Sequence, residues 1–196
     1  MKITKKMKPY QLQDYKFTLV ITVLVLTVLG VMVIGSAKAS VQNKQILGLG
    51  IGIIAMVVIS LLDYVWVLKF YWVLYFFNIA MLIFTRIFGT EVNGAKRWID
   101  LKVTTFQPSE VTKIIMILFF AKYLMDHEDT INTPKTILTS IGLMIPTLIL
   151  IVKQPDLSTT ISLAVVFGIV MFIGGLSYKL IGAVFAILIP AAVIFI

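Results

Sequence analysis

The sequence lacks cysteine altogether and contains a single histidine, His127. The absence of cysteine excludes disulfide bonds and thiolate metal sites, and one histidine leaves little from which to build a metal centre. Charged residues are also scarce, because Asp, Glu, Lys and Arg make up only 13% of the chain, against about 25% in a typical soluble domain. Phosphate-cradling loops that end in Lys-Ser/Thr and HExxH zinc motifs are missing as well, so nothing supports an ATPase or a zinc protease.

Apolar residues dominate the rest, at 60% of the 196 residues compared with about 45–50% in soluble proteins. This composition predicts an integral membrane protein, in which lipid covers the apolar surface and helices satisfy their own backbone polar groups. A helix that crosses the bilayer needs about 20 apolar residues, within a range of roughly 17–25. Seven segments of the chain come close to that rule: 17–35, 46–62, 70–85, 108–125, 137–152, 157–174 and 180–196.

These segments predict an all-α fold, a polytopic membrane helix bundle with about seven transmembrane helices of roughly 20 residues each. Residues 1–196 form a single predicted membrane domain, which begins with a basic tail, 1–16. The first apolar segment has no small-residue cleavage site followed by a soluble domain, so it is predicted to be a retained helix. The last one ends at Ile196 without the aromatic or basic residues that usually anchor a helix at the interface, which predicts that the chain is part of a larger protein.

Positive charge exceeds negative charge, with 17 Lys and Arg against 9 Asp and Glu, which indicates contact with anionic lipid headgroups. Five of the lysines lie in the tail 1–16, and this predicts a cytoplasmic N-terminus. Alternation of the spans then places nine cations inside, seven outside and one, Lys113, within a span. Without the tail the balance reverses to four against seven. Either the outer cations bind an anionic ligand, or the predicted topology is wrong.

The first candidate site is the predicted outer loop that contains NGAKRWIDLK, residues 93–102. Its Asn-Gly dipeptide is a turn signal, and Lys96, Arg97 and Trp98 follow shortly after it. Arg grips a phosphate with two parallel hydrogen bonds, Lys adds a point charge, and Trp offers an apolar ring with one donor. The group suits a lipid-linked phosphate at the membrane surface. The same residues also suit an interfacial loop with an aromatic anchor and snorkelling cations.

The second candidate is FQPSEVTK, residues 106–113. Pro108 suits the first position of a helix, and Glu110 suits the first turn, where a carboxylate meets the positive end of the helix dipole. Glu110 and Lys113 are three residues apart and therefore share one helix face. Since ionisable groups within a span are costly and usually functional, we expect this pair to line a water-filled cavity. A well-started helix with one internal ion pair is the alternative.

The third candidate is KQPDLSTT, residues 153–160. Its proline ends the preceding helix, and Asp156 can cap the next one by accepting from an N–H two or three residues further on. Capping alone accounts for an aspartate at this position. Asp156 is also predicted at the same outer level as Glu110 and Lys113, so two carboxylates and two lysines could form one polar site.

These three motifs, in this order, closely resemble the SEDS family of shape, elongation, division and sporulation proteins, which includes the RodA, FtsW and SpoVE proteins. LLDYVWVLKFYWVLY and GLSYKLIG also resemble that family, so the resemblance covers essentially the whole chain. A mild departure is Ser158-Thr159-Thr160, where the family more often has Gly-Thr-Ala or similar, but small and hydroxyl residues are kept. WIDL and KQPDLSTT favour RodA, the elongation member, over the division member FtsW.

The resemblance implies a multi-pass protein of the bacterial cytoplasmic membrane with about ten helices of roughly 20 residues, of which about seven are present in this chain. It implies a peptidoglycan glycosyltransferase that polymerises lipid II, an undecaprenyl-pyrophosphate-linked disaccharide peptide, beside a class B penicillin-binding protein. The family's catalytic aspartate lies in a later extracytoplasmic region, so we expect it beyond residue 196 and expect this chain alone to be inactive. Nucleic acid is not an expected partner. No cofactor is evident, and a divalent metal is compatible with the chemistry, although no ligand cluster demands one.

The resemblance also implies that the charged motifs bind the substrate. We expect Lys96 and Arg97 to bind the lipid-linked pyrophosphate beside Trp98, and Glu110, Lys113 and Asp156 to line and order the cavity. Two other functions stay open. A flippase or transporter for the same lipid accounts equally well for charges within the membrane. A non-catalytic scaffold that only docks the penicillin-binding protein needs no chemistry at all.

Overall fold

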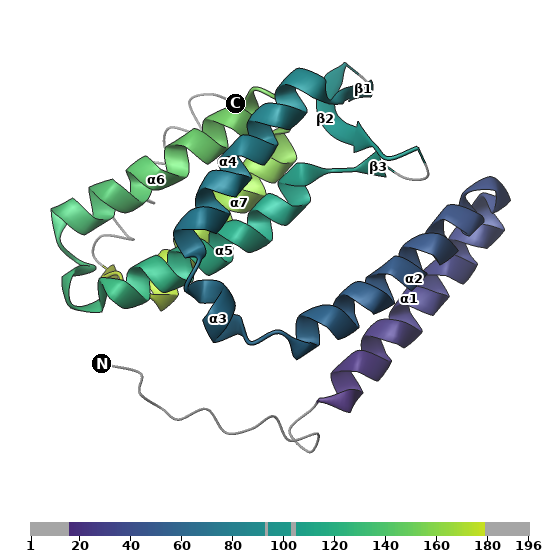
Figure 1. Cartoon of the computed structure of the whole chain (residues 1–196), viewed down its shortest axis with the longest axis horizontal. Coiled ribbons are helices and arrows are strands. Elements are labelled where there is room, and N and C mark those ends of the chain that lie inside the picture. The colour runs from purple at the N-terminus through teal and green to yellow at the C-terminus, as the bar shows by residue number, and fades with distance from the viewer. Residues whose placement is uncertain (1–15, 93, 103–104, 179–196) are drawn as a thin grey trace. The chain divides into compact units, whose positions relative to one another are not determined.

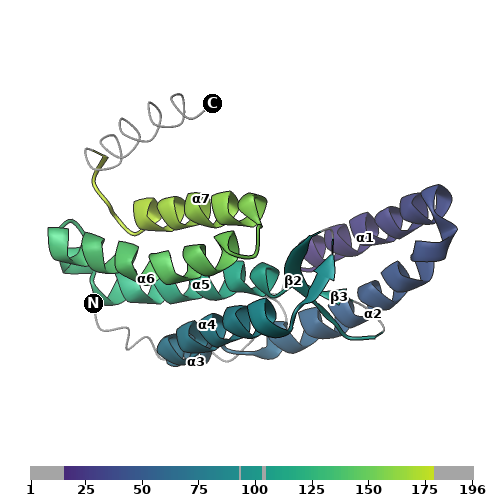
Figure 2. The same ribbon diagram turned by 90° about the horizontal axis from the view of Figure 1, so that it is seen from above.

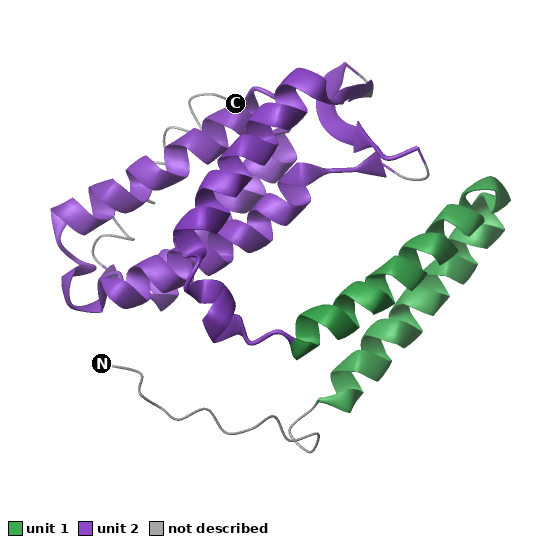
Figure 3. Cartoon of the chain, viewed as in Figure 1, with its two compact units in different colours: residues 1–61 green, residues 62–196 purple. Residues whose placement is uncertain are grey.

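The computed structural model describes residues 16–92, 94–102 and 105–178, and nearly all of its regular structure is helical (Figure 1). The chain divides into two compact units, residues 1–61 and residues 62–196 (Figure 3). The prediction of a single domain, 1–196, is not tested by this division and stays a prediction.

The first unit is a hairpin of two long helices, α1 (Phe17–Ala37) and α2 (Ala39–Leu61), which pack against each other. A loop was expected between the predicted spans, but only Lys38 separates the helices, with an extended backbone at φ −151° and ψ 89°. Within the described part of this unit, Val31 is the one buried side chain of the two helices. An apolar exterior of this kind is stable in lipid, where hydrocarbon surface needs no cover from protein.

In the described part of the second unit, four long helices pack in a ring, so that α4 and α7 each contact both α5 and α6 (Figures 1 and 2). Two short helices lie at the turns. The helices described in this unit are α3 (Tyr64–Leu68), α4 (Tyr71–Phe88), α5 (Pro108–Asp126), η2 (Glu128–Thr130), α6 (Pro134–Val152) and α7 (Leu157–Ile173).

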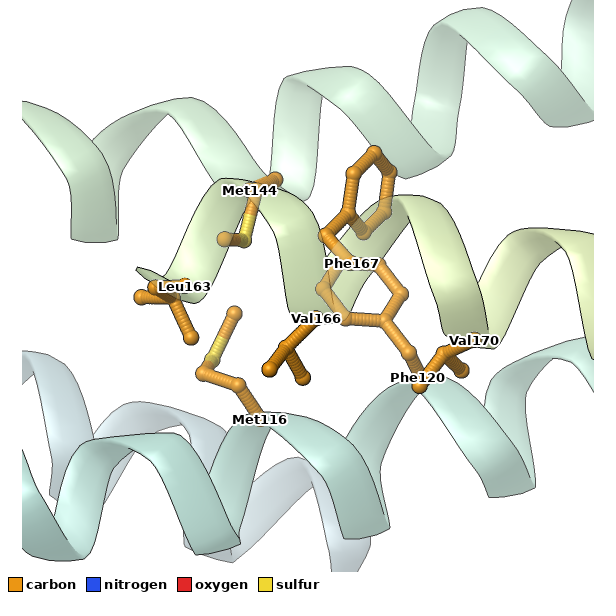
Figure 4. Close-up of a pocket in the computed structure, with 7 residues that line it drawn as sticks. All are labelled: Met116, Phe120, Met144, Leu163, Val166, Phe167 and Val170. Atoms are coloured by element: carbon orange, nitrogen blue, oxygen red, sulfur yellow. The ribbon is translucent and has the colours of Figure 1, made fainter. Parts of the chain in front are cut away.

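The centre of the ring is dry and aromatic. Phe119 of α5 is fully buried and contacts the rings of Trp72 and Tyr75 on α4, with centroids 5.2 and 4.7 Å apart. Figure 4 shows the place where α5, α6 and α7 meet, and the gap that Met116 and Met144 border has no room for a water molecule. Aromatic pairs add about 0.5–1.5 kcal/mol each beyond the area they bury, so α5 is held firmly at the centre of the bundle.

A small antiparallel sheet of β1 (Thr90–Val92), β2 (Ala95–Asp100) and β3 (Thr105–Phe106), in that order, connects α4 to α5. It replaces the loop that was expected over residues 86–107. Gly94 has φ +78° in the turn between β1 and β2, a conformation that glycine adopts without a steric penalty. The sheet sits at one end of the bundle, where β2 contacts α4 and α5 (Figure 1).

The all-α membrane fold is confirmed, apart from this sheet. Six of the seven predicted spans fall on helices, and the seventh, 180–196, lies outside the described residues. Among the described helices, α1, α2, α4 and α6 are long and apolar enough to cross a membrane. α7 is apolar but shorter, and α5 has 19 residues with an ion pair near each end, Glu110–Lys113 and Lys122–Asp126.

Candidate functional site

Polar side chains gather at the end of the bundle that carries the sheet. There α4 ends, α5 begins, and a short connection joins α6 to α7 (Figure 1). Segments distant in the sequence meet at this end: Arg86 donates from Nη1 to the carbonyl of Lys153 at 3.0 Å, and Gln107 donates to Asp156 at 2.8 Å. The three sequence motifs therefore converge on one end of the molecule.

Asp156 is the most enclosed charge of this end, with 3% of its surface exposed. Its Oδ1 accepts the backbone N–H of Thr159 at 3.1 Å, which makes it the N-cap of α7 as predicted. Its Oδ2 accepts from Gln107 Nε2 at 2.8 Å, and Arg97 Nη1 lies 3.8 Å from Oδ1. One carboxylate thus ties together β2, the start of α5 and the start of α7.

Gln107 was not recognised as a site residue from the sequence. It precedes Pro108, the first residue of α5, and its Nε2 donates both to Asp156 and to Ser109 Oγ at 3.0 Å. Ser109 is completely buried. A glutamine beside a helix-starting proline is only weak sequence evidence for a site residue, because the tertiary fold determines which carboxylate its amide contacts.

Two buried polar atoms close to this cluster have no hydrogen-bond partner among the described residues, Arg97 Nε and Gln154 Oε1. Gln154 is 1% exposed and donates from Nε2 to the carbonyl of Leu82 at 3.0 Å. Buried groups of this kind are nearly always paired in proteins. Both atoms belong to residues at the sheet end of the bundle, one on β2 and one in the connection from α6 to α7.

An open depression of about 290 Å³ lies next to the cluster, lined by Arg86, Glu91, Gly94, Lys96, Lys153 and Pro155. Three of these residues are cations and one is an anion. Lys96 and Arg97 are neighbours on β2, and successive side chains of a strand point to opposite faces. Accordingly, Lys96 borders the depression while Arg97 reaches Asp156.

The predicted pair on α5 forms, since Lys113 Nζ lies 2.9 Å from the carboxylate of Glu110. Among the residues that the structure describes, no hydrogen bond or ion pair joins this pair to Asp156, and the single site of two carboxylates and two lysines stays a prediction. Glu110 is exposed over 56% of its side chain. Trp98 is half-buried on β2, opposite Thr90 in the sheet. The roles assigned to these residues with substrate stay predictions.

In the described part of the chain, no three His, Asp or Glu side chains lie close enough together to hold a metal ion. His127 stacks on Tyr123 with ring centroids 4.3 Å apart, and its Nδ1 contacts the Tyr123 carbonyl at 2.8 Å. The expectation that a divalent metal is compatible with the chemistry stays a prediction.

Long apolar helices with a charged cluster at one end of their bundle define a multi-pass membrane protein with a polar site at one end of its helices. Residues 11–196 match the family of FtsW, RodA and SpoVE proteins, described as cell cycle protein. The chain belongs to this family, as its motifs predicted.

Relatives carry both family names. "Probable peptidoglycan glycosyltransferase FtsW" of Thiomicrospira cyclica is 32% identical over 194 residues, which cover 87% of this chain and 49% of that protein. "Peptidoglycan glycosyltransferase RodA" of Treponema pallidum is 32% identical over 179 residues, which cover 87% of this chain and 41% of that protein. The chain spans about half the length of the curated relatives it matches, and identity does not separate the two types.

Solved structures show the same fold. The Rod shape determining protein RodA of Thermus thermophilus matches with a TM-score of 0.76 and 26% identity, over 90% of this chain and 59% of that one. A chain of the peptidoglycan synthase complex described under "Structural coordination of polymerization and crosslinking by a peptidoglycan synthase complex" matches with a TM-score of 0.78 and 28% identity. The alignment covers 92% of this chain and 55% of that one.

Proposed function

We propose that the protein to which these residues belong is a peptidoglycan glycosyltransferase that polymerises lipid II during cell elongation, as a RodA-type enzyme. Membership of the family carries this proposal, because the relatives of both types are named peptidoglycan glycosyltransferases. WIDL and KQPDLSTT favour the elongation type over the FtsW type. The N-terminus is cytoplasmic in this proposal, and the charged end of the bundle faces outward.

The reaction transfers a sugar from a diphosphate to a sugar hydroxyl. A bond forms between the hydroxyl oxygen and the anomeric carbon, the bond from that carbon to the diphosphate oxygen breaks, and the hydroxyl proton passes to a carboxylate base. The diphosphate leaves with concentrated negative charge, which cations at the membrane surface stabilise. Lys96 and Arg97 supply that charge in this proposal, and the catalytic aspartate is not assigned to any residue of this chain.

In this proposal the remaining site residues hold the outer end of the helix bundle in a fixed arrangement. Asp156 holds Arg97 and the start of α7 in place, while Glu110 and Lys113 form a charged wall on α5. Trp98 offers an apolar ring beside the charged groups, which suits a substrate with a polyprenyl tail and a charged head. This arrangement supports binding of an amphipathic lipid whose phosphates stay at the membrane surface.

The partner in this proposal is a class B penicillin-binding protein. The support is a structural match to a chain from a complex described as coordinating polymerization and crosslinking. If the partnership holds, the protein expressed from its native gene will co-purify with that transpeptidase.

The test is polymerisation of purified lipid II by the protein expressed from its native gene. Arg97→Ala removes the guanidinium that is proposed to stabilise the leaving group and is expected to lower the rate about 10²–10³-fold, since losing one such donor costs about 2.7–4 kcal/mol of transition-state stabilisation. Lys135→Ala, at the opposite end of α6, is the matched control and is expected to polymerise normally. An unchanged rate in Arg97→Ala, at equal expression, would remove this residue from the site.

A flippase for the same lipid is distinguished by a second measurement on the same protein. Translocation of lipid II across vesicles without any glycan product would exclude the polymerase and favour transport. Glycan strands made from lipid II in detergent, where no translocation occurs, would decide for the enzyme.

A further inference from the structure

The depression beside β2 is lined by three cations that come from three different parts of the chain. Arg86 lies in the last turn of α4, Lys96 on β2, and Lys153 at the end of α6. Their only acidic neighbour in the lining is Glu91. The fold therefore gathers charges of one sign that are up to 67 residues apart in the sequence.

These cations have no carboxylate partner in the described part of the chain. The ion pairs found there join Arg97 to Asp156, Lys113 to Glu110 and Lys122 to Asp126. Glu91 lines the depression but forms none of these pairs. A concave surface that collects unpaired charge of one sign focuses its field and concentrates counter-ions.

A backbone carbonyl holds Arg86 in the lining of the depression. One of its terminal nitrogens donates to the Lys153 carbonyl at 3.0 Å. Since a guanidinium has five N–H donors, four remain for a ligand. The bond uses the main chain of Lys153, so that residue's ammonium group also stays available.

We propose that Arg86, Lys96 and Lys153 form a subsite for the phosphate groups of a membrane lipid, separate from the Arg97–Asp156 cluster. Alternation along β2 divides the Lys96–Arg97 dyad between two sites, so this inference moves Lys96, which the proposed function places with Arg97 on the leaving diphosphate, to the second site. Arg97 has a carboxylate within 3.8 Å, whereas Lys96 has two further cations around it. The depression, at about 290 Å³, is open and large enough for a phosphate group rather than a lone ion.

A polyprenyl diphosphate is the occupant that the proposed function favours, and this identification rests on that function. When two lipid II molecules are joined, both carry a diphosphate, and only one of the two leaves. A polymerase therefore has to hold two diphosphates close together. Two cationic centres on opposite faces of one strand fit this requirement.

The experiment measures equilibrium binding of undecaprenyl diphosphate to the protein expressed from its native gene, in phosphatidylcholine nanodiscs. Lys153→Gln removes the charge but keeps the carbonyl that accepts from Arg86, so the fold is undisturbed. The double variant Arg86→Gln/Lys153→Gln is expected to bind one diphosphate fewer than the unaltered chain, because the altered site is weakened at least tenfold, a difference of about 1.4 kcal/mol, while the Arg97 centre is kept. Lys135→Gln, at the opposite end of α6, is the matched control and is expected to bind within about twofold of the unaltered chain.

Binding by the double variant that equals the unaltered chain, at equal melting temperature, overturns the subsite. A second arm replaces the diphosphate by phosphatidylglycerol in the nanodisc. If the variant loses only phosphatidylglycerol binding, the phosphate site stands and its occupant is a phospholipid headgroup. The experiment measures binding and does not measure polymerisation. If the protein binds diphosphate at this subsite but makes no glycan, the subsite stands and the proposed function fails.

Discussion

At the scale of single residues, Asp156 holds the outer end together mainly through hydrogen bonds. Hydrogen bonds to a charged group are worth about 1.5–3 kcal/mol, whereas a partly exposed ion pair is worth roughly 0–1 kcal/mol. The carboxylate accepts from Thr159 and Gln107 at 3.1 and 2.8 Å, while half-exposed Arg97 stands 3.8 Å away. The two N–H donors therefore contribute more than the opposite charge, and Arg97 keeps freedom to meet a ligand.

This ranking predicts different outcomes for two substitutions of Asp156. Asp156→Ala removes the N-cap of α7 and also removes the carboxylate that accepts from the Gln107 amide. It is therefore expected to lower the free energy of unfolding by about 2 kcal/mol or more. Asp156→Asn keeps one oxygen to cap α7, and its Nδ2 can donate to Oε1 of Gln107 once that amide turns over, so it is expected to cost less than about 1 kcal/mol. Thermal unfolding in detergent measures both. Equal losses in the two variants would mean that the charge opposite Arg97 matters more than the hydrogen bonds.

The sequence revealed the site residues whose partners are close along the chain. The cap of Asp156 on Thr159 and the Glu110–Lys113 pair span three residues each, and both predictions are confirmed. The missed contacts are long-range. Gln107 reaches Asp156 across 49 residues, and Gln154 reaches Leu82 across 72. No periodicity or spacing encodes such contacts, because they depend on how α4, α5, α6 and α7 pack.

At the scale of secondary structure elements, the junction between α4 and β1 depends on Gly89. Its backbone is extended, with φ −64° and ψ 148°, so the glycine is not needed for its dihedral angles. It is needed for space, since a Cβ atom there would lie 2.2 Å from the carbonyl oxygen of Thr85. That carbonyl accepts the Gly89 N–H at 2.7 Å, and this bond closes the last turn of α4.

Gly89→Ala is therefore expected to destabilise the second unit by about 1–3 kcal/mol, as overpacked sites usually do. Gly142→Ala is the matched control, because nothing lies within 4 Å of a Cβ at that position in α6. Alanine favours a helix over glycine by up to about 1 kcal/mol, so the control is expected to be neutral or slightly stabilising. Melting temperatures of the two variants in the same detergent test this. An unchanged melting temperature of Gly89→Ala would show that the backbone at the end of α4 shifts without cost to make room for the Cβ atom.

Helices were predictable from hydropathy, but the connections between them were not. The sheet was missed because its strands have three, six and two residues, too short for an alternating pattern to stand out. The α1–α2 turn was missed for a different reason. Gln42, Asn43 and Lys44 are polar and suit a loop, yet they lie inside α2, whose first turns therefore carry the polar residues. Polarity alone does not distinguish a loop from a helix end at the membrane surface.

At the scale of the whole molecule, charge is distributed unevenly between the two ends of the helix ring. In the described part of residues 62–178, the sheet end carries five cations at its loops, strands and helix ends, Arg86, Lys96, Arg97, Lys102 and Lys153, and a sixth, Lys113, is paired with Glu110 near the start of α5. The opposite end carries three, Lys69, Lys122 and Lys135. The positive-inside rule applied to this unit alone would place the sheet end in the cytoplasm. The basic tail 1–16, with five lysines, argues for the reverse orientation.

We expect the tail to decide the orientation, because the charge around the first helix usually dominates topology. α1, α2 and α4 then cross in turn, which places the sheet outside. The absence of native cysteine gives a clean test, since Leu101→Cys and Asp129→Cys each introduce the only thiol. Both positions are exposed, one beside the sheet and one in η2 at the opposite end.

A membrane-impermeant maleimide is expected to label Leu101→Cys in intact cells and Asp129→Cys only after permeabilisation. The unaltered chain, which has no thiol, is the background control in both conditions. The reverse labelling pattern would place the sheet in the cytoplasm, where its cations satisfy the ordinary charge bias and require no ligand. That result would remove the charge argument for an outward-facing diphosphate site. The expected pattern instead leaves five cations on the outer side that the insertion rule does not explain, which is the position a lipid-borne phosphate would occupy.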